Sequence, residues 1–359
     1  MRLDARAYRV PTDAPEADGT LAWSSTTMVV VEAGHDGVTG AGWTYGPAAA
    51  ARIVTDLLAP AVRDTDPDDV PAAWVAMQRS VRNAGRPGVA GLALSAADCA
   101  VWDLKARRHG LPLATLLGAV RRELPVYGSG GFTTYDDQRQ HQQLAEWVHE
   151  QGIPRVKIKI GESWGTRVPR DLARMAAARR TIGDGAELFV DANGAYGRKQ
   201  AVEVMQAASD LDVRWFEEPV SSDDLAGLAH VRDHVSADVA AGEYGYDLVY
   251  FRRMADVVDC LQVDVTRCGG ISELMRVAAV AAAAGLEVST HCAPHQHAAA
   301  AAAVPNLRHL EWFHDHVRIE SMLFADTAPA TGGSLPVNTT RPGTGVRLRA
   351  EAAEPYRVA

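Results

Sequence analysis

The stretch Arg155-Val156-Lys157-Ile158-Lys159-Ile160 decides how the rest of the chain is interpreted. Its apolar and basic residues alternate, which predicts a short β-strand with the aliphatic side chains on one face and Lys157 and Lys159 on the other. Taken alone, the pattern is also typical of an edge strand whose lysines are solvated. The surrounding sequence has to distinguish these two interpretations.

Lysine is rare in this chain, which gives the pair more weight. Of the 36 Lys and Arg residues, only four are lysine: Lys105, Lys157, Lys159 and Lys199. Arginine stays protonated in proteins, whereas lysine can act as a base when its pKa is lowered. A second ammonium group nearby lowers a lysine's pKa by repulsion. The pair therefore predicts a base for proton abstraction, with Lys157 lowering the pKa of Lys159.

Seven other apolar segments alternate with helical segments along the chain. The eight predicted strand cores are 124–127, 156–160, 188–190, 213–216, 239–241, 258–263, 286–289 and 307–310. The helical patterns between them are 138–151, 169–182, 198–208, 223–235, 248–255, 270–284 and 294–303. Because crossover helices lie outside a parallel sheet, this repeat predicts a closed α/β barrel. A doubly wound open sheet is the alternative, but no G-x-G-x-x-G motif follows the first strand.

The residues before and after this repeat have a different character. Residues 1–120 predict an α+β domain with strands at 26–32 and 40–45, and helices at 48–58, 68–83 and 92–109. The stretch Pro11–Thr20, rich in Pro, Asp, Glu and Gly, predicts an exposed loop. From about residue 321, Pro and Gly interrupt short apolar pieces, which indicates a tail that returns to the first domain. We therefore expect three parts: 1–120, 121–320 and 321–359.

The composition limits the class of protein and its partners. With 359 residues, 47% hydrophobic and 23% charged, the chain is typical of a globular protein with a large core. Its net charge of −9 argues against nucleic acid or an anionic membrane as the main partner. The four cysteines contain no C-x-x-C pair, no signal peptide begins the sequence, and the Ala-rich runs are too short to span a bilayer. We expect a cytoplasmic enzyme and a homo-oligomer, and small anionic substrates remain possible because a site can be locally positive.

A polar residue ends each predicted strand, and in a parallel barrel these ends meet at one mouth. In strand order they are Tyr127 and Ser129, Lys157 and Lys159, Asp191 with Asn193, Glu217 and Glu218, Glu243, Asp264, His291, and Glu311. A single strand-end acid is usually a helix cap or a solvated turn, and a single histidine is often a hydrogen-bonded core residue. Ionisable groups at the ends of seven successive strands favour an active site.

Three of these acids predict a metal site. Asp191, Glu217 and Glu243 follow three successive strands, and three carboxylates brought together repel one another unless a cation neutralises them. Ligands that are all oxygen select a hard ion, which indicates Mg²⁺, with Mn²⁺ as the alternative.

The remaining groups predict acid–base chemistry around that metal. Lys159 lies on one side and His291 on the other, and Asp264 is placed to accept a hydrogen bond from the imidazole and fix its tautomer. Two such groups on opposite sides of a carboxylate substrate suit removal of the proton α to that carboxylate. Glu311, if protonated, would donate to the same substrate oxygens, and Lys157 would add positive charge.

These residues occur in motifs that resemble the mandelate racemase subgroup of the enolase superfamily. The motifs are Leu94-Ser95-Ala96-Ala97-Asp98, Trp102-Asp103-Leu104-Lys105-Ala106, Leu116-Leu117-Gly118, Lys157-Ile158-Lys159, Val190-Asp191-Ala192-Asn193-Gly194, Trp215-Phe216-Glu217-Glu218-Pro219, Ala241-Gly242-Glu243, Asp264-Val265-Thr266-Arg267-Cys268-Gly269-Gly270 and the pair His291 and Glu311. The resemblance implies a modified (β/α)7β TIM-type barrel under an α+β capping domain. It also implies Mg²⁺ on Asp191, Glu217 and Glu243. A lysine or histidine base acting beside Mg²⁺ is the established chemistry of that superfamily.

The resemblance implies a reaction class but leaves the substrate open. Lys159 and the His291–Asp264 dyad would be opposed acid–base groups. The branch that lactonises muconate and epimerises dipeptides has a lysine where this chain has Asp264, which excludes this chain from that branch. The subgroup contains dehydratases of acid sugars and racemases of α-hydroxy acids.

We favour dehydration of an acid sugar to a 2-keto-3-deoxy acid, because aromatic content is low and polar groups lie near His291. A racemase or epimerase of an α-hydroxy acid is the alternative, and a non-catalytic binding protein on this fold is a third. The expected substrate-binding residues are Ser129, Asn193, Tyr45 and Trp23. His295 and His297 would either line a polar pocket or lie in solvated turns.

Overall fold

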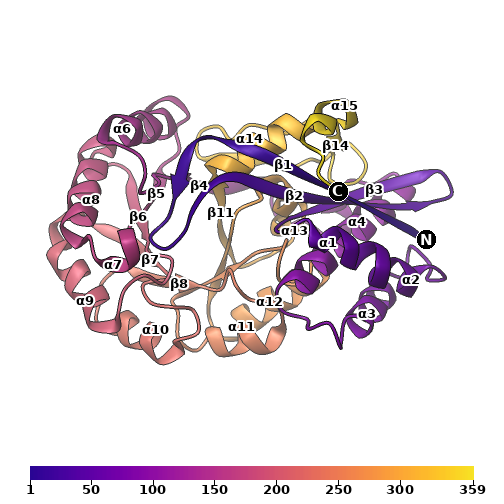
Figure 1. The fold of residues 1–359 in the computed structure, drawn as a ribbon, viewed down its shortest axis with the longest axis horizontal. Helices are drawn as coiled ribbons and strands as arrows, with labels where there is room; N and C mark the ends of the chain where they lie inside the picture. Colours follow the sequence, from indigo (N-terminus) through magenta and orange to yellow (C-terminus); the bar gives the residue numbers. More distant parts are fainter.

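The computed structural model describes residues 1–359 and divides them between a barrel and a smaller sheet with helices that covers one end of it (Figure 1). No helix is long and apolar enough to cross a membrane. Both parts were predicted from the sequence. The structure differs from the prediction in the N-terminal strand and in the segment after the barrel.

The capping part is a three-stranded antiparallel sheet with helices on one face. Its strands, in spatial order, are β1 (Arg2–Ala17), β2 (Ala22–His35) and β3 (Val38–Tyr45). Its helices are α1 (Ala49–Ile53), a π-helical turn (Val54–Leu58), α2 (Ala59–Val62), α3 (Val70–Ser80) and α4 (Val89–Arg108). α4 lies directly on β3, because Gly42 has no side chain: a Cβ atom there would lie 2.4 Å from the carbonyl oxygen of Ala96.

The prediction of an exposed loop at Pro11–Thr20 was wrong for most of its length. β1 continues to Ala17, and Glu16 is fully buried. The pairing of β1 with β2 shifts register between Pro11 and Glu16, which hides the strand from a simple alternation pattern. The loop after the first barrel strand holds this part of β1, since the Thr133 N–H donates to the Ala17 carbonyl at 2.8 Å. A tertiary contact therefore orders a segment that its composition makes resemble a loop.

The barrel has eight parallel strands in the order of the sequence, and the last pairs with the first, which confirms the predicted closed barrel. The strands are β4 (Glu123–Gly130), β5 (Arg155–Lys159), β6 (Glu187–Asp191), β7 (Val213–Glu217), β8 (Asp238–Ala241), β9 (Cys260–Val263), β10 (Glu287–Thr290) and β11 (Leu307–Phe313). The segments connecting β3 to β11 include α5 (Leu113–Leu117), α6 (Asp137–Ala145), a π-helical turn (Glu146–Glu150), α7 (Glu162–Gly165), α8 (Val168–Ile182), α9 (Arg198–Ala207), a 3-10 turn (Ser209–Leu211), α10 (Leu225–Arg232), α11 (Leu248–Met254), α12 (Ile271–Ala283) and α13 (Pro294–Ala302).

A helix that the sequence analysis did not predict follows the eighth strand. α14 (His314–Leu323) buries Ile319 and Leu323 in a cluster that also contains Met28 and Trp43 of the capping sheet. The tail continues with β12 (Phe324–Ala325), β13 (Ser334–Pro336), β14 (Arg347–Leu348), α15 (Ala350–Ala353) and a 3-10 turn (Glu354–Tyr356). β13 pairs with β4 of the barrel, and the backbone of Ala7 in β1 bonds to that of Val358 and Ala359. The tail thus contacts both parts of the molecule.

The two faces of β5 have the environments that the alternation predicted for a barrel strand. Val156 and Ile158 belong to the large apolar core around the barrel, whereas Lys157 and Lys159 point into the barrel and are buried. In the register of the sheet, Lys159 pairs with Asp191 and Asp191 pairs with Glu217. Three ionisable groups therefore lie side by side at the carboxyl ends of three neighbouring strands.

An aromatic layer fills the barrel beneath these charges. The rings of Phe189 and Trp215 stack with centroids 5.5 Å apart, and Tyr127 lies 5.5 Å from Phe189. The Lys157 ammonium lies 5.2 Å from the centroid of the Tyr127 ring. Packed rings thus close the barrel below the charged layer.

Candidate active site

Two lysines and three acids form a buried ion-pair network at the barrel mouth. The Lys159 ammonium is bonded to Asp191. The Lys157 ammonium lies 2.5 Å from an oxygen of Glu217 and 2.8 Å from an oxygen of Glu311. Buried charges are stable only when paired, and here each ammonium has at least one carboxylate partner.

Glu243 approaches this network from the loop after β8. Gly242, just before it, has φ 138°, and a Cβ atom there would lie 2.1 Å from the carbonyl oxygen of Gln262, so only glycine fits. One Glu243 oxygen accepts a hydrogen bond from Arg267 at 3.1 Å, and the other lies 3.2 Å from His291 Nε2. The loop thereby brings a third carboxylate to the side of the cavity where His291 lies.

His291 and Asp264 form the predicted dyad. His291 Nδ1 donates to Asp264 Oδ2 at 2.8 Å, which leaves Nε2 for a proton-transfer role. Burial disfavours the Asp264 carboxylate, but the hydrogen bond and charge of His291 outweigh it and hold the pKa of Asp264 well below its usual range. Burial lowers the pKa of His291, yet Glu243 and Asp264 outweigh it and leave that pKa raised.

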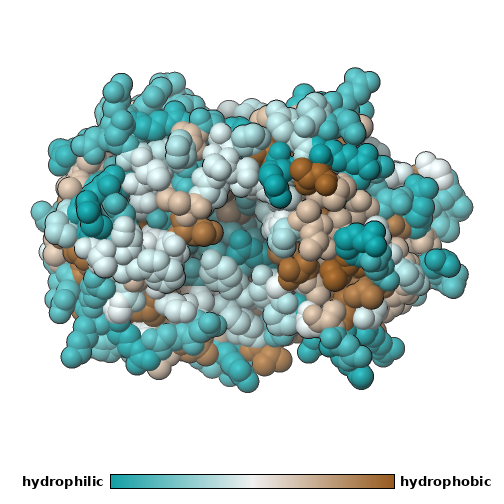
Figure 2. Space-filling view, viewed as in Figure 1, coloured by the Kyte–Doolittle hydropathy of each residue, from teal (hydrophilic) through white to brown (hydrophobic).

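A cavity of about 350 Å³ opens above these groups, between the barrel mouth and the capping sheet. The surface is hollowed near the centre of the face shown in Figure 2. Six predicted site residues line this cavity: Lys159, His291, Glu243, Asn193, Tyr45 and Trp23. The other six are absent from its lining, and all are buried: Asp191, Glu217, Lys157, Asp264, Glu311 and Ser129.

The chemistry of the donor set fits a divalent cation, although ligand oxygens of Asp191, Glu217 and Glu243 do not all lie within 4.8 Å of one another. Lys157, Lys159 and Arg267 supply three positive charges, whereas five carboxyl groups meet them: Asp191, Glu217, Glu243, Asp264 and Glu311. The carboxyl groups thus outnumber these three permanent cations by two, and burial raises the pKa of Glu217 to about 8. Asn193 Oδ1 is buried without a hydrogen-bond donor, and Glu243 Oε2 has only its 3.2 Å contact with His291 Nε2. Carboxylate and amide oxygens are ligands that Mg²⁺ and Mn²⁺ accept.

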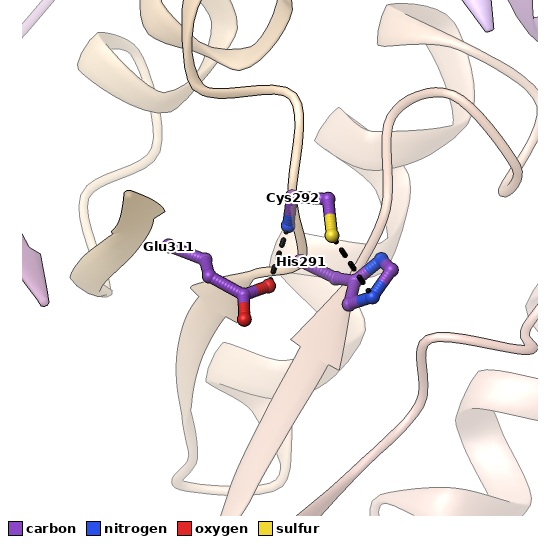
Figure 3. Close-up of side chains that lie close together, drawn as sticks. All are labelled: His291, Cys292 and Glu311. Atoms are coloured by element: carbon purple, nitrogen blue, oxygen red, sulfur yellow. Dashed lines mark hydrogen bonds between the residues drawn. The ribbon is translucent and has the colours of Figure 1, made fainter. Parts of the chain in front are cut away.

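A second group of ligand-type atoms lies beside the dyad but does not suit a metal. Atoms of His291, Cys292 and Glu311 lie within 4.8 Å of one another (Figure 3). Glu311 already accepts hydrogen bonds from Ser129 Oγ at 2.6 Å and from the Cys292 N–H at 2.7 Å. Burial raises the pKa of the Cys292 thiol well above its usual range, and a thiol is a poor metal ligand until it loses its proton. These contacts position the loop that carries His291.

The sequence allowed Glu311 to donate to the substrate only if it were protonated, and its surroundings favour the carboxylate. Burial favours its neutral form, but the neighbouring Lys157 ammonium outweighs this and holds the pKa of Glu311 well below its usual range. Glu311 therefore accepts hydrogen bonds in this network rather than donating them. The sequence placed Glu311 at a strand end but did not reveal that Lys157 lies 2.8 Å away.

The net pKa shift of Lys159 is also opposite to the prediction. Burial and the Lys157 charge both lower it, but attraction to Asp191 outweighs them and leaves the pKa of Lys159 raised. The sequence analysis considered the second lysine and neglected the carboxylate on the neighbouring strand.

The residues expected to bind substrate differ in their positions. Trp23 lines the cavity, and its indole N–H donates to Glu16 at 2.7 Å. Tyr45 also lines it, stacks on His316 with ring centroids 3.4 Å apart, and donates weakly to Glu320 at 3.4 Å. Ser129 lies below the cavity and bonds to Glu311.

His295 and His297 do not line the active-site cavity, and both are buried. His295 lines a separate cavity with polar residues such as Asp326 and Asn338, so the polar-pocket alternative holds for it away from the site, whereas His297 fits neither alternative. His295 Nδ1 lies 2.6 Å from Glu320, and His297 Nε2 accepts from the Val265 N–H at 2.8 Å. They hold α13 against neighbouring segments.

Sequence reasoning missed Arg267, which bonds to Glu243 and lies 3.4 Å from Asp264. The sequence feature that could have revealed Arg267 is its position in the loop after the strand, three residues beyond Asp264. It also missed Ser25, Thr26 and Thr27 of the cavity wall from the cap, and Tyr244 from the barrel.

The fold and site together define an α/β-barrel protein with a capping domain and a carboxylate-rich mouth. Residues 140–353 match the family model described as enolase C-terminal domain-like. Residues 5–118 match the model of the N-terminal domain of mandelate racemase and muconate lactonizing enzyme. The chain therefore belongs to the mandelate racemase subgroup of the enolase superfamily, as its strand-end motifs predicted.

Its relatives include enzymes and solved structures. The chain is 32% identical over 292 residues to the L-talarate/galactarate dehydratase of Salmonella typhimurium, which covers 77% of this chain and 71% of the relative. A mandelate racemase/muconate lactonizing enzyme-like protein from Rubrobacter xylanophilus is 48% identical over 99% of both chains, with a TM-score of 0.96. A racemase from Streptomyces coelicolor A3(2), solved with bound magnesium, is 30% identical over 99% of both chains, with a TM-score of 0.92.

Proposed function

We propose that this protein is a Mg²⁺-dependent enzyme that removes the proton α to a substrate carboxylate, and that it dehydrates an acid sugar to a 2-keto-3-deoxy acid. One observation carries the proposal: Lys159 and His291 reach the same cavity from β5 and from the end of β10, and the imidazole is held by Asp264 at 2.8 Å. The relationship to a dehydratase of two acid sugars supports it.

The two groups divide the work of an elimination. One of them takes the α-proton from carbon, and the other gives a proton to the departing β-hydroxyl, which leaves as water. The resulting enol then becomes the 2-keto-3-deoxy acid. Asp264 keeps the His291 tautomer that presents Nε2 to the cavity, and Lys157 adds fixed positive charge beneath it.

Asp191, Glu217 and Glu243 are the residues that would hold the metal, with the buried amide oxygen of Asn193 close by. A bound Mg²⁺ would supply positive charge beside the substrate carboxylate and so stabilise the enediolate that proton removal creates. The surplus of two carboxyl groups supports a dication at this position.

Racemisation or epimerisation of an α-hydroxy acid is the second candidate function. The same two groups serve it if one removes the α-proton and the other returns a proton to the opposite face. The 30% identical structure described as a racemase favours keeping this candidate. A binding protein without catalysis is the third, and the paired Lys159 and His291 in one cavity weigh against it.

Incubating the enzyme with Mg²⁺ and candidate acids in D₂O tests the proposal. The dehydratase should release a 2-keto acid, whereas deuterium at the α-carbon without keto acid would identify the racemase. Lys159→Ala removes one of the two bases. Exchange of the α-proton that Lys159 removes in the parent protein should then slow by about 10²–10⁴-fold, the usual contribution of a general base. Lys199→Ala is the matched control, because Lys199 is exposed and lies outside the cavity. If both variants exchange the α-proton at the same rate as the parent protein, the result supports the candidate of a binding protein without catalysis.

The cellular location and assembly are further parts of the proposal. All four cysteines are buried and none forms a disulfide, which supports a reducing compartment such as the cytoplasm. Light scattering coupled to size-exclusion chromatography would test the expected homo-oligomer.

A further inference from the structure

The two ends of the cavity differ in charge, and this difference limits the substrate. Its floor carries the cations Lys159 and Arg267, but both are committed: Lys159 bonds to Asp191, and Arg267 bonds to Glu243. His316 on the rim adds no charge, because burial holds its pKa well below the usual range. The only cations on the wall therefore lie where the reacting carboxylate and the metal would be.

The roof, which the capping sheet supplies, has no cation. Its residues from β2 and from the turn before it are Asp18, Leu21, Trp23, Ser25, Thr26 and Thr27. Tyr45 at the end of β3 and the following Gly46 and Pro47 complete it. The only ionisable side chain among the first six is the acid Asp18.

Asp18 is held in place as a hydrogen-bond acceptor. Its Oδ1 accepts from the Thr20 N–H at 2.6 Å, the Thr20 hydroxyl at 3.0 Å and the Leu21 N–H at 2.7 Å. All three bonds go to the same oxygen, so Oδ2 stays available to accept from a ligand hydroxyl. A second carboxylate at this end of the cavity would meet repulsion from Asp18 without a compensating cation.

The other polar groups on the roof suit hydroxyl groups. Thr26 is occupied by a hydrogen bond to Asp315, and the Trp23 N–H by Glu16. The hydroxyls of Ser25 and Thr27 have no partner within the protein, and both are only partly buried. A hydroxyl both donates and accepts, so this pair can bind neutral hydroxyls of a substrate chain.

We infer that the substrate is a monocarboxylic acid whose far end is an uncharged polyhydroxyl chain, read by Asp18, Ser25 and Thr27. This inference rests on the proposed function and narrows it. It also separates this chain from its relative that acts on L-talarate and galactarate, since both of those acids carry a carboxylate at each end. The cavity of about 350 Å³ is near the lower end of the size range of small-molecule sites and suits a compact sugar acid.

The test compares monoacids with diacids of the same chain length and configuration: galactonate with galactarate, and gluconate with glucarate. Binding is measured by calorimetry on Mg²⁺-loaded Lys159→Ala, in which turnover does not interfere. We expect the better monoacid to bind at least about tenfold more tightly than its diacid, the effect of one unpaired like charge. A diacid that binds as tightly as its monoacid would overturn the inference. Proton exchange by the parent enzyme in D₂O reports separately on the proposed function.

A charge introduced into the roof sharpens the test. Ser25→Arg should narrow the preference for the monoacid by about tenfold, because it gives a second carboxylate a partner. Ser25→Gln has a similar length without the charge and should narrow the preference far less than Ser25→Arg. Thr27→Arg, with Thr27→Gln as its control, repeats the comparison at a second position if a Ser25 variant does not fold. If the Gln and Arg variants shift the preference equally, side-chain size rather than charge reads the far end, and the inference fails.

Discussion

The barrel half and the cap half of the cavity are built on different principles. The barrel half consists of charged groups at fixed strand ends, where the register alone places Lys159 beside Asp191 and Asp191 beside Glu217. The cap half consists of neutral or single acidic groups on a sheet whose position depends on packing against α4, α14 and the loop after β4. The order and register of the barrel strands therefore determine the positions of the reactive groups. The packing of the capping sheet on the barrel determines the positions of the groups that recognise the substrate.

The first way to test this difference changes charge in the barrel half without changing shape. Asp264→Asn keeps the size of the side chain, but the amide can turn its NH₂ toward His291 Nδ1 and stabilise the wrong tautomer. We expect α-proton exchange by His291 to fall by about 10²–10⁴-fold, with little change in the melting temperature. Stopped-flow or NMR exchange assays measure the rate. A comparable loss of rate in Asp223→Asn, an exposed control away from the cavity, would contradict the assignment.

The second test changes shape in the cap half without changing charge. Gly42→Val puts side-chain atoms where the Ala96 carbonyl lies, because the Cβ atom alone would be 2.4 Å from it. We expect unfolding free energy to fall by about 1–3 kcal/mol, or more if α4 shifts, as in overpacked cores. The matched control is Gly37→Asn in the β2–β3 turn, where φ is 80° and no atom lies within 4 Å of a Cβ. Chemical denaturation of both variants decides whether the close approach of α4 and β3 matters.

How well each half could be predicted follows from the same difference. Asp191, Glu217, Glu243, Asp264 and His291 were found because each follows a recognisable strand in a repeating pattern. The charge of Glu311 was left open, and the net rise in the pKa of Lys159 was not foreseen although Lys157 does lower it, since each depends on a partner on another strand. The strand character of residues 11–17 depends on the loop after β4, and no local pattern in the sequence reports that contact.

The smallest expected effect concerns Glu16, a buried acid of the cap half. It is fully buried in the cap, and burial raises its pKa to about 8 from an ordinary value near 4.5. Between these two values the folded protein holds a proton that the unfolded chain has lost, so stability from this group falls as the pH rises toward 8. Glu16→Gln should therefore be more stable than the parent protein by about 1–2 kcal/mol at pH 8.5 and equal to it below pH 4.5. Thermal unfolding at both pH values measures this, and a constant difference would show that the carboxyl group does not titrate in this range.

The aromatic layer under the charged network has a practical consequence for spectroscopy. The Trp215 indole N–H donates to Glu217 at 2.9 Å, and the ring is almost completely buried in the barrel. A cation that binds the Glu217 carboxylate will change the electric field along that N–H bond. The emission of Trp215 will change with it. Dissolved quenchers such as iodide reach the exposed Trp164 far more readily than Trp215. The barrel therefore contains an optical probe directly below the place where charge changes, and fluorescence titration can follow occupancy of the site without a substrate.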